Sequence, residues 1–261
     1  VFIAGVGGMG GACLMSIVRA GFEKVGIADI DTFDVSNLNR QVFSNLTSVG
    51  LDKAMSTLDQ IKNLNPQADI RNWGADWLTH LDQILQTYKI VVNGTDDIRA
   101  TLQLYRKAKE YGCTVIDAYT SPLPSVYVTG PQDPRPEERL RFPSRGKAIA
   151  DLTAQDIDGC KLAEVIHVMS HSNSIAHIDF DLALEMVAGK RPRMSLAPMV
   201  ITTGNLMAYQ VVYLALSRTK KTDPVGYFLN PLKGTIERPS NFLVRKIKEF
   251  LVRRYLQKVL A

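Results

Sequence analysis

The segment that most constrains the fold is a glycine-rich turn, Gly5-Val-Gly7-Gly8-Met-Gly10-Gly11. It directly follows the apolar run Val1–Ala4, which predicts a β-strand, and it opens an amphipathic stretch that predicts a helix to about Ala20. Glycine permits the tight turn, lets the backbone approach a phosphate closely, and leaves the N–H groups of a helix start free to bind an anion. Because a glycine pattern of this kind also occurs in purely structural turns, its context has to decide between the two interpretations.

The context is that of a dinucleotide fold. Asp29 closes the next predicted strand, Val25–Asp29, at a distance where such folds place a carboxylate against the ribose hydroxyls. Short apolar runs then alternate with longer amphipathic stretches, which is typical of a parallel sheet covered by helices. The remaining strands predicted in this half are Ile70–Asn72, Ile90–Asn93, Thr114–Asp117 and Ser125–Thr129, and the helices are Leu51–Leu64, Trp77–Tyr88 and Ile98–Tyr111. The predicted fold is α/β, a doubly wound, Rossmann-like, mostly parallel sheet extended by antiparallel strands.

The chain divides into four predicted segments. Residues 1–130 form the nucleotide-binding half, and 131–194 form an insertion over the active site that begins with a proline-rich loop (130–147) and continues with helices over 154–169 and 178–189. Residues 195–239 complete the same domain with a late helix, Pro198–Leu216, and a hairpin of Tyr227–Asn230 and Gly234–Glu237. Residues 240–261 form a basic amphipathic helix capped by Ser240.

Charge and composition exclude several classes of protein. The net charge of +5 resides in residues 241–261, which hold six Lys or Arg and one Glu, and the rest of the chain is neutral. A basic groove for nucleic acid is therefore not expected. No apolar run is long enough to span a membrane. Three widely spaced cysteines form no Cys-x-x-Cys pair, which argues against structural zinc and for a reducing, cytoplasmic setting. Because the chain begins inside a strand, a preceding segment is expected.

Polar residues beyond the glycine turn favour phosphate chemistry. Asp29 opens a run that includes Asp31, Asn37, Arg40 and Gln41, and the following helix starts at Lys53. Asp96 follows the strand Ile90–Asn93, at the edge where ligands bind in open α/β sheets. A carboxylate that attacks the α-phosphorus of ATP needs no general base, but its transition state needs cations.

Each of these residues has a predicted role. Arg40 and Lys53 are the candidates for contacting the phosphates, Asn37 and Gln41 for orienting the triphosphate, and Asp96 for holding Mg²⁺ with ATP oxygens. Singly, Arg40 and Lys53 also fit solvated surface cations, and Asp96 fits a turn or a helix cap. An NAD-dependent oxidoreductase is disfavoured, because a hydride-transfer site has no evident use for these cations.

The same residues resemble the ThiF/MoeB/HesA family, bacterial relatives of ubiquitin-activating enzymes. The matching motifs are Gly5–Gly10, Asp29-x-Asp31, Ser36–Gln41, Gly50-x-x-Lys53 and Thr95-Asp96. The resemblance implies that Gly5, Gly7, Gly8, Gly10, Asp29, Asp31, Asn37, Arg40, Gln41 and Lys53 bind ATP, with Arg40, Lys53 and Asp96 catalytic and Asp96 working with Mg²⁺. It also implies a homodimer.

The resemblance further implies an ATP-dependent adenylyltransferase. The expected substrate is the C-terminal glycine of a ubiquitin-like or sulfur-carrier protein, activated as an acyl-adenylate with release of pyrophosphate. Adenylation of a peptide or small-molecule carboxylate, and a nucleotide-binding module without turnover, are the alternatives. The chain departs from the family in lacking zinc-binding Cys-x-x-Cys pairs, in having Asp97 and Thr101 where Asn and Arg are usual, and in having no cysteine just before the late helix.

The insertion and the tail carry weaker signals. Arg139, Arg141 or Arg145 could touch the substrate's carboxylate end, or the loop could simply be solvated. Cys160 is expected to be a packing residue. The i,i+4 pair His167 and His171, with His177, could hold a metal, but surface or interface histidines are the favoured interpretation. The tail is expected to pack on the domain or a second subunit, with a partner protein and a membrane surface as alternatives.

Overall fold

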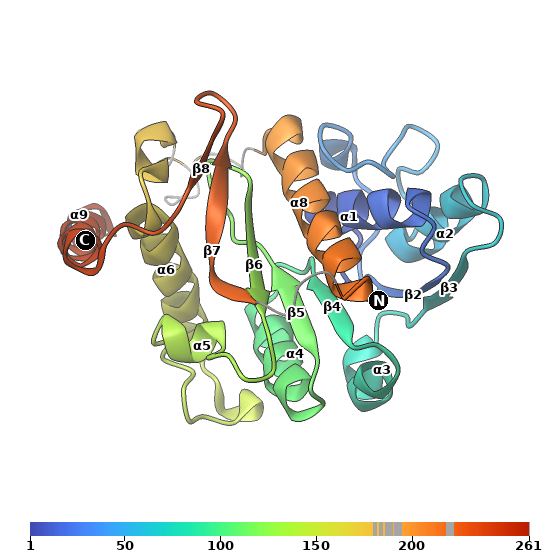
Figure 1. The fold of residues 1–261 in the computed structure, drawn as a ribbon, viewed down its shortest axis with the longest axis horizontal. Helices are drawn as coiled ribbons and strands as arrows, with labels where there is room; N and C mark the ends of the chain where they lie inside the picture. The colour runs from blue at the N-terminus through green and yellow to red at the C-terminus, as the bar shows by residue number, and fades with distance from the viewer. Residues whose placement is uncertain (180–181, 183–184, 186–189, 191–194, 218–221, 261) are drawn as a thin grey trace.

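The computed structural model describes residues 1–260 except 180–181, 183–184, 186–189, 191–194 and 218–221 (Figure 1). Its centre is one eight-stranded sheet with the order β3-β2-β1-β4-β5-β6-β7-β8. The first five of these strands pair in parallel and the last three are antiparallel. The strands are β1 (Phe2–Ala4), β2 (Lys24–Ala28), β3 (Asp69–Asn72), β4 (Ile90–Asn93), β5 (Thr114–Asp117), β6 (Ser125–Thr129), β7 (Asp223–Asn230) and β8 (Thr235–Glu237). This order confirms the predicted doubly wound sheet with an antiparallel extension.

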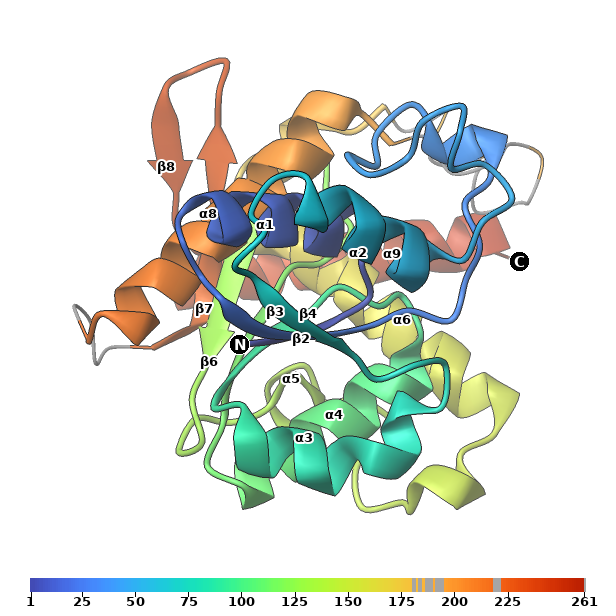
Figure 2. The same cartoon turned by 90° about the vertical axis from the view of Figure 1, so that its right-hand side faces the viewer.

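Helices cover both faces of the sheet, as Figure 2 shows. The helices are α1 (Gly8–Arg19), α2 (Lys53–Lys62), α3 (Leu81–Thr87), α4 (Ile98–Glu110), α5 (Pro136–Arg139), α6 (Ala154–His171), α8 (Ala197–Ala215) and α9 (Phe242–Leu260). Short 3₁₀ turns are η1 (Val35–Asn37), η2 (Trp77–His80), η3 (Ile149–Asp151) and η4 (Ser174–His177). Among the described residues, no helix is both long and apolar enough to cross a bilayer.

Two apolar cores follow from the alternation of side chains along the strands. Ile3 packs with α1, α2 and α8 on one face, whereas its neighbour Phe2 packs with α3 and α4 on the other. The same alternation separates Val92 from Val91 in β4. Both faces are therefore buried, which explains why these strands read as short continuous apolar runs.

Several predicted boundaries change. The predicted helix Trp77–Tyr88 divides into η2 and α3, and β7 begins at Asp223, before the predicted Tyr227. The C-terminal helix α9 is capped by Asn241, whose Oδ1 accepts from the N–H of Val244 at 2.9 Å, not by Ser240. The hydroxyl of Ser240 instead accepts from the ammonium of Lys248 at 3.0 Å. Most of the helix predicted over 178–189 lies outside the described residues.

The proline-rich segment 130–147 was expected to be a loop, but it contains the single helical turn α5. The backbone N–H of Arg135 donates to the Glu138 carboxylate at 2.9 Å and so closes the start of this turn. Glu137 forms an ion pair with Arg106 of α4 at 2.5 Å. These contacts with α4 order a segment whose local sequence favours no regular element.

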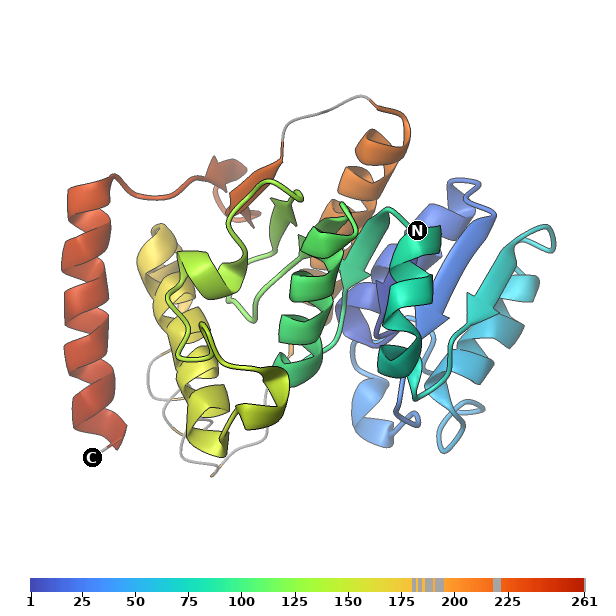
Figure 3. The same ribbon diagram turned by 90° about the horizontal axis from the view of Figure 1, so that it is seen from below.

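The insertion and the tail pack together at the end of the molecule opposite α1 and α2 (Figures 1 and 3). Val252 and Leu256 of α9 are buried against Ile166 and Met169 of α6, as expected for a tail that packs on its own domain. Cys160 of α6 is fully buried in a separate apolar cluster, which confirms its packing role.

The histidine prediction was wrong in its placement. His167 and His171 are buried, 9% and 0% exposed, and not on the surface, because they pack under Tyr127 of β6. Burial lowers the pKa of both rings, that of His171 to about 4. His171 Nε2 lies 3.0 Å from the carbonyl of Val225, and His177 Nε2 accepts from Asn230 at 3.1 Å. No group of three potential metal ligands is found among the described residues.

Candidate nucleotide site

A cleft of about 330 Å³ opens where the parallel strands end. It lies at the switch point of the doubly wound sheet, between the turns that follow β1 and β4. These two turns touch, because Gly94 donates its N–H to the carbonyl of Ala4 at 2.7 Å. The cleft is lined by residues 5, 7–9, 28–31, 40–41, 53, 75, 77–78, 94–97, 100, 119–121, 195 and 199–200.

Close packing explains the glycines of the first turn. Gly5 has a φ of +85°, a left-handed conformation that favours glycine. A side chain at Gly10 would place its Cβ 1.9 Å from the carbonyl oxygen of Gly5, so α1 could not start so close to β1. Gly5, Gly7 and Gly8 line the cleft, whereas Gly10 does not. Gly10 therefore contributes to the close packing of α1 against the turn and not to the cleft surface.

Asp29 joins the end of β2 to the glycine turn. Its carboxylate accepts from the backbone N–H of Val6 at 2.7 Å and from that of Asp31 at 3.0 Å. Burial raises the pKa of Asp29, while these two N–H groups and the charge of Lys53 act in the opposite direction. Asp29 is 8% exposed as a residue and lines the cleft, and its two hydrogen bonds hold the carboxylate in place.

Lys53 enters the cleft from the first turn of α2. Its side chain is 8% exposed, and its ammonium forms an ion pair with Asp31 at 2.9 Å. The backbone holds this position, because the N–H of Lys53 donates to the carbonyl of Asp31 at 3.0 Å and Asp52 caps the helix. The interpretation of Lys53 as a solvated surface cation is wrong.

Arg40 and Gln41 follow η1 on the segment that closes the cleft. Arg40 donates to the carbonyl of Ser36 at 2.8 Å and to Asn39 Oδ1 at 2.9 Å. The Gln41 amide packs over Gly7, and its Oε1 is buried without a hydrogen-bond partner among the described residues. Such an orphaned buried atom points to a missing partner. Asn37 does not line the cleft, since its Oδ1 accepts from the N–H of Asp34 and completes the cap of η1.

Two adjacent acids follow β4 with different surroundings. Asp97 is the cap of α4, because its carboxylate accepts from the N–H groups of Arg99 and Ala100. Asp96 lines the cleft, is exposed, and has no hydrogen bond or ion pair among the described residues. The helix-cap interpretation therefore applies to Asp97, and Asp96 is left to face the cleft. Thr101, where the family usually has Arg, accepts from Asn93 Nδ2 at 3.2 Å.

Some cleft residues were not predicted. Tyr119, Thr120 and Ser121 follow β5, and the strand-end argument that selected Asp96 could also have selected them. Met199 and Val200 belong to the first turn of α8, which crosses α1 from the far end of the sequence. Nothing local in the sequence indicates that this helix start reaches the glycine turn.

The three arginines proposed for the substrate do not line the cleft. Arg141 and Arg145 are exposed, and Arg141 has a φ of +56°. Arg139 points inward and donates to the Tyr119 hydroxyl at 3.3 Å. The insertion therefore reaches the cleft indirectly, through Tyr119.

Comparison with known proteins identifies the family. The family model described as "ThiF family" matches residues 1–243, so the chain belongs to the ThiF family. Over 98 residues it is 31% identical to a "Probable molybdopterin-synthase adenylyltransferase" of Porphyra purpurea, covering 37% of this chain and 26% of that protein. It is 34% identical over 98 residues to "Probable adenylyltransferase/sulfurtransferase MoeZ" of Mycobacterium tuberculosis, covering 37% of this chain and 25% of that protein. The matched part spans about a quarter of these relatives.

Solved structures share the fold at lower identity. The structure titled "Crystal structure of E. coli MccB + MccA-N7isoASN" has a TM-score of 0.61 and 15% identity, covering 91% of this chain and 63% of that one. "Crystal Structure of SeMet PaaA" has a TM-score of 0.60 and 18% identity, covering 91% and 72%. At these identities the likeness shows a common fold.

Proposed function

We propose that this chain is an ATP-dependent adenylyltransferase that activates a carboxylate as an acyl-adenylate and releases pyrophosphate. The observation that carries the proposal is the meeting of Lys53, Arg40 and Asp96 with the glycine turn in one cleft. These residues come from three separate chain segments, and all face the place where a nucleotide phosphate would approach the N-terminus of α1. Membership of the ThiF family and two relatives named adenylyltransferases support it.

The residues would act by positioning and charge. Asp29 accepts hydrogen bonds from the ribose hydroxyls, and the backbone N–H groups of the glycine turn donate to the phosphates. Lys53 exchanges its ion pair with Asp31 for one with a phosphate. An ionised carboxylate attacks the α-phosphorus, the bond to the pyrophosphate oxygen breaks, and the departing pyrophosphate carries the electron pair. Arg40 and Lys53 stabilise the negative oxygens that gather in this step.

The charges of the cleft support Mg²⁺ as a cofactor. Asp29, Asp31, Asp96 and Asp97 line it against only Arg40 and Lys53 among the described lining residues, so a bare triphosphate would meet an excess of carboxylates. Asp96 would hold the ion, with most ligands supplied by phosphate oxygens and water. When bound, Mg²⁺ neutralises phosphate charge.

The carboxylate is proposed to be the C-terminal glycine of a ubiquitin-like or sulfur-carrier protein. The names "SUMO-activating enzyme subunit 2", from Dictyostelium discoideum, and MoeZ, a sulfurtransferase, support this class; the former is 28% identical over 123 residues, covering 46% of this chain and 19% of that protein. A peptide or small-molecule carboxylate and a module without turnover stay as alternatives. A homodimer and a reducing, cytoplasmic setting are further parts of the proposal; the three cysteines are free and buried.

Calorimetric titration tests the site. MgATP should bind the wild type, and Lys53→Ala should weaken binding by about tenfold or more, because a charge-assisted hydrogen bond is lost. Lys62→Ala, which removes an exposed lysine of the same helix, is the matched control and should bind normally. Tight NADH binding that ignores Lys53 would refute the proposal. Carboxylate-dependent exchange of pyrophosphate into ATP then separates an enzyme from a binding module.

A further inference from the structure

Tyr119 and Asp29 line opposite ends of the cleft. The sheet places β2, β1, β4 and β5 in that order, so the turns after β2 and β5 are about 14 Å apart at normal strand spacing. In the proposed function Asp29 fixes the ribose beside β2 and the glycine turn fixes the phosphates beside β1. A group attached beyond the α-phosphate would then extend toward Asp96 and Tyr119, after β4 and β5.

The Tyr119 ring is held rigidly. It packs 4.6 Å from the Tyr127 ring and 5.6 Å edge-on to His167, in a cluster with Leu123 and Phe228. Only 6% of the residue is exposed. Burial raises the pKa of the Tyr119 hydroxyl above its usual range, so the hydroxyl keeps its proton.

Arg139 contacts the Tyr119 hydroxyl. Its Nη2 donates to the Tyr119 hydroxyl oxygen at 3.3 Å, which occupies an acceptor position on that oxygen. Tyr119 lines the cleft, and among the described residues no acceptor takes its hydroxyl proton. The other nitrogens of Arg139, Nε and Nη1, are buried without partners, so the guanidinium has no competing ion pair among these residues.

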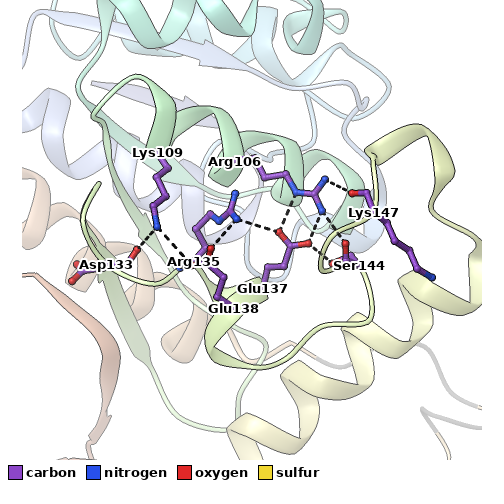
Figure 4. Close-up of polar contacts among 8 residues, drawn as sticks. All are labelled: Arg106, Lys109, Asp133, Arg135, Glu137, Glu138, Ser144 and Lys147. Atoms are coloured by element: carbon purple, nitrogen blue, oxygen red, sulfur yellow. Dashed lines mark hydrogen bonds and ion pairs between the residues drawn. The ribbon is translucent and has the colours of Figure 1, made fainter.

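The insertion is built to hold Arg139 there. Figure 4 shows α5 fastened to α4 through Glu137, which accepts from Arg106 at 3.0 and 2.5 Å and from the Ser144 hydroxyl at 2.7 Å. Arg106 also donates to the carbonyl of Lys147 at 2.8 Å. Arg139 is the last residue of α5, so this network holds the helical turn that carries it.

We propose that Tyr119 donates a hydrogen bond to the acyl oxygen of the substrate carboxylate and of the acyl-adenylate, and that Arg139 is the positioning residue that orients this donor. The inference rests on the proposed function and adds to it the place where the acyl group binds. An acyl oxygen is common to every acyl-adenylate, so the inference holds for any carboxylate substrate.

Two nucleosides separate acyl recognition from nucleotide recognition. The probes are 5′-O-sulfamoyladenosine, which lacks an acyl group, and 5′-O-(N-acetylsulfamoyl)adenosine, which carries the smallest one. Calorimetry measures the dissociation constant of each probe for the wild type and each variant. The acyl advantage is the dissociation constant of the unacylated probe divided by that of the acetylated probe. Tyr119→Phe keeps the packed ring and should reduce the advantage of the acetylated probe about five- to tenfold, with binding of the unacylated probe unchanged.

The arginine is tested through a double-mutant cycle. Arg139→Met should lose most of the same advantage, Arg139→Lys should restore part of it, and Tyr119→Phe combined with Arg139→Met should match Tyr119→Phe alone. The exposed neighbour Arg141→Met is the control and should behave as the wild type. Thermal unfolding checks that each variant is folded.

The outcomes are distinguishable. A Tyr119→Phe variant that keeps the full acyl advantage, or loses affinity for both probes equally, overturns the inference while the nucleotide site stands. Additive losses in the double variant overturn the positioning role of Arg139. If neither probe nor MgATP binds the wild type, the proposed function itself fails, together with the inference that rests on it.

Discussion

Two ionisable residues, the half-buried Glu164 and the buried Asp117, set constraints on the stability of the fold. Glu164 of α6 has its pKa raised to about 8, chiefly by burial and secondly by the charge of Asp117. Burial likewise raises the pKa of Asp117 to about 6, although the Tyr105 hydroxyl donates to it at 3.0 Å. The charges of both carboxyl groups also raise the pKa of Tyr119, after the larger effect of burial. Their ionisation therefore works against the folded state.

The pH dependence of stability tests whether ionisation of Glu164 destabilises the folded protein. A folded-state pKa above the unfolded value means that the folded protein binds the extra proton, so stability is lost as pH rises from about 4.5 to about 8. Relative to Glu164→Gln, the wild type should lose on the order of 3 kcal/mol of unfolding free energy across this window. Denaturant unfolding at several pH values measures it. Asp158→Asn, at an exposed position on the same helix, should give a flat difference, and a flat difference for Glu164→Gln would contradict the assignment.

At the scale of elements, the short helix α5 shows how a tertiary contact orders a weak local signal. Four residues cannot sustain a helix alone, since nucleation is unfavourable. The Glu137 side chain is 4% exposed and that of Arg106 is 19% exposed, so their ion pair is largely removed from water. Removing one partner of such an ion pair leaves the charge of the other partner buried and uncompensated.

Removal of one partner gives a direct measurement. Glu137→Gln should lower the free energy of unfolding by about 3 kcal/mol, because Arg106 loses its counter-charge. Asp59→Asn removes an acid from the exposed pair with Lys62 and should change it by about 0.5 kcal/mol or less. Equal effects of the two substitutions in denaturant titrations would show that the Arg106 pair does not anchor the insertion.

The strands and the insertion differ in how far sequence could predict them. The bounds of β4, β5 and β6 agree with the predicted runs because both faces of the sheet are buried and each run is short and apolar. The segment 130–147 has no such pattern, and its helical turn depends on Arg106, which is more than two dozen residues away in sequence. Likewise Tyr119 could be placed at a strand end from sequence, but its contact with Arg139 could not.

On the scale of the whole molecule, the basic tail α9 packs on α6 at one end (Figure 1), whereas the nucleotide cleft lies at the ends of β1 and β4 within the sheet. The apolar positions Leu243, Ile247, Phe250, Leu251 and Leu256 favour one side of the predicted last helix, which would be the side that packs. In the structure the first four are exposed, between 57% and 72%, and Val252 and Leu256 face α6. This expectation was wrong because α9 carries apolar residues on two sides. Contact with α6 determines which of the two sides is buried.

Truncation at residue 239 tests this separation of site and tail. The shortened chain should bind MgATP with an affinity within about twofold of the full chain, since none of the described side chains of α9 lines the cleft. It should also be less stable by about 2 kcal/mol or more, because Ile166 and Met169 lose their apolar cover. Calorimetry and thermal unfolding report the two effects. A tenfold loss of MgATP affinity would mean that the tail supports the site.

The sequence by itself determined the parallel half of the sheet, the glycine turn, the strand ends followed by Asp29 and Asp96, and the helix start at Lys53. These features depend on local patterns and on the rule that ligands bind where parallel strands end. Only the tertiary structure decided that Asp97 and not Asp96 caps α4, that Arg139 contacts the cleft residue Tyr119, and which side of α9 is buried. The physical reason is that these depend on contacts between segments far apart in the chain, which no local pattern encodes.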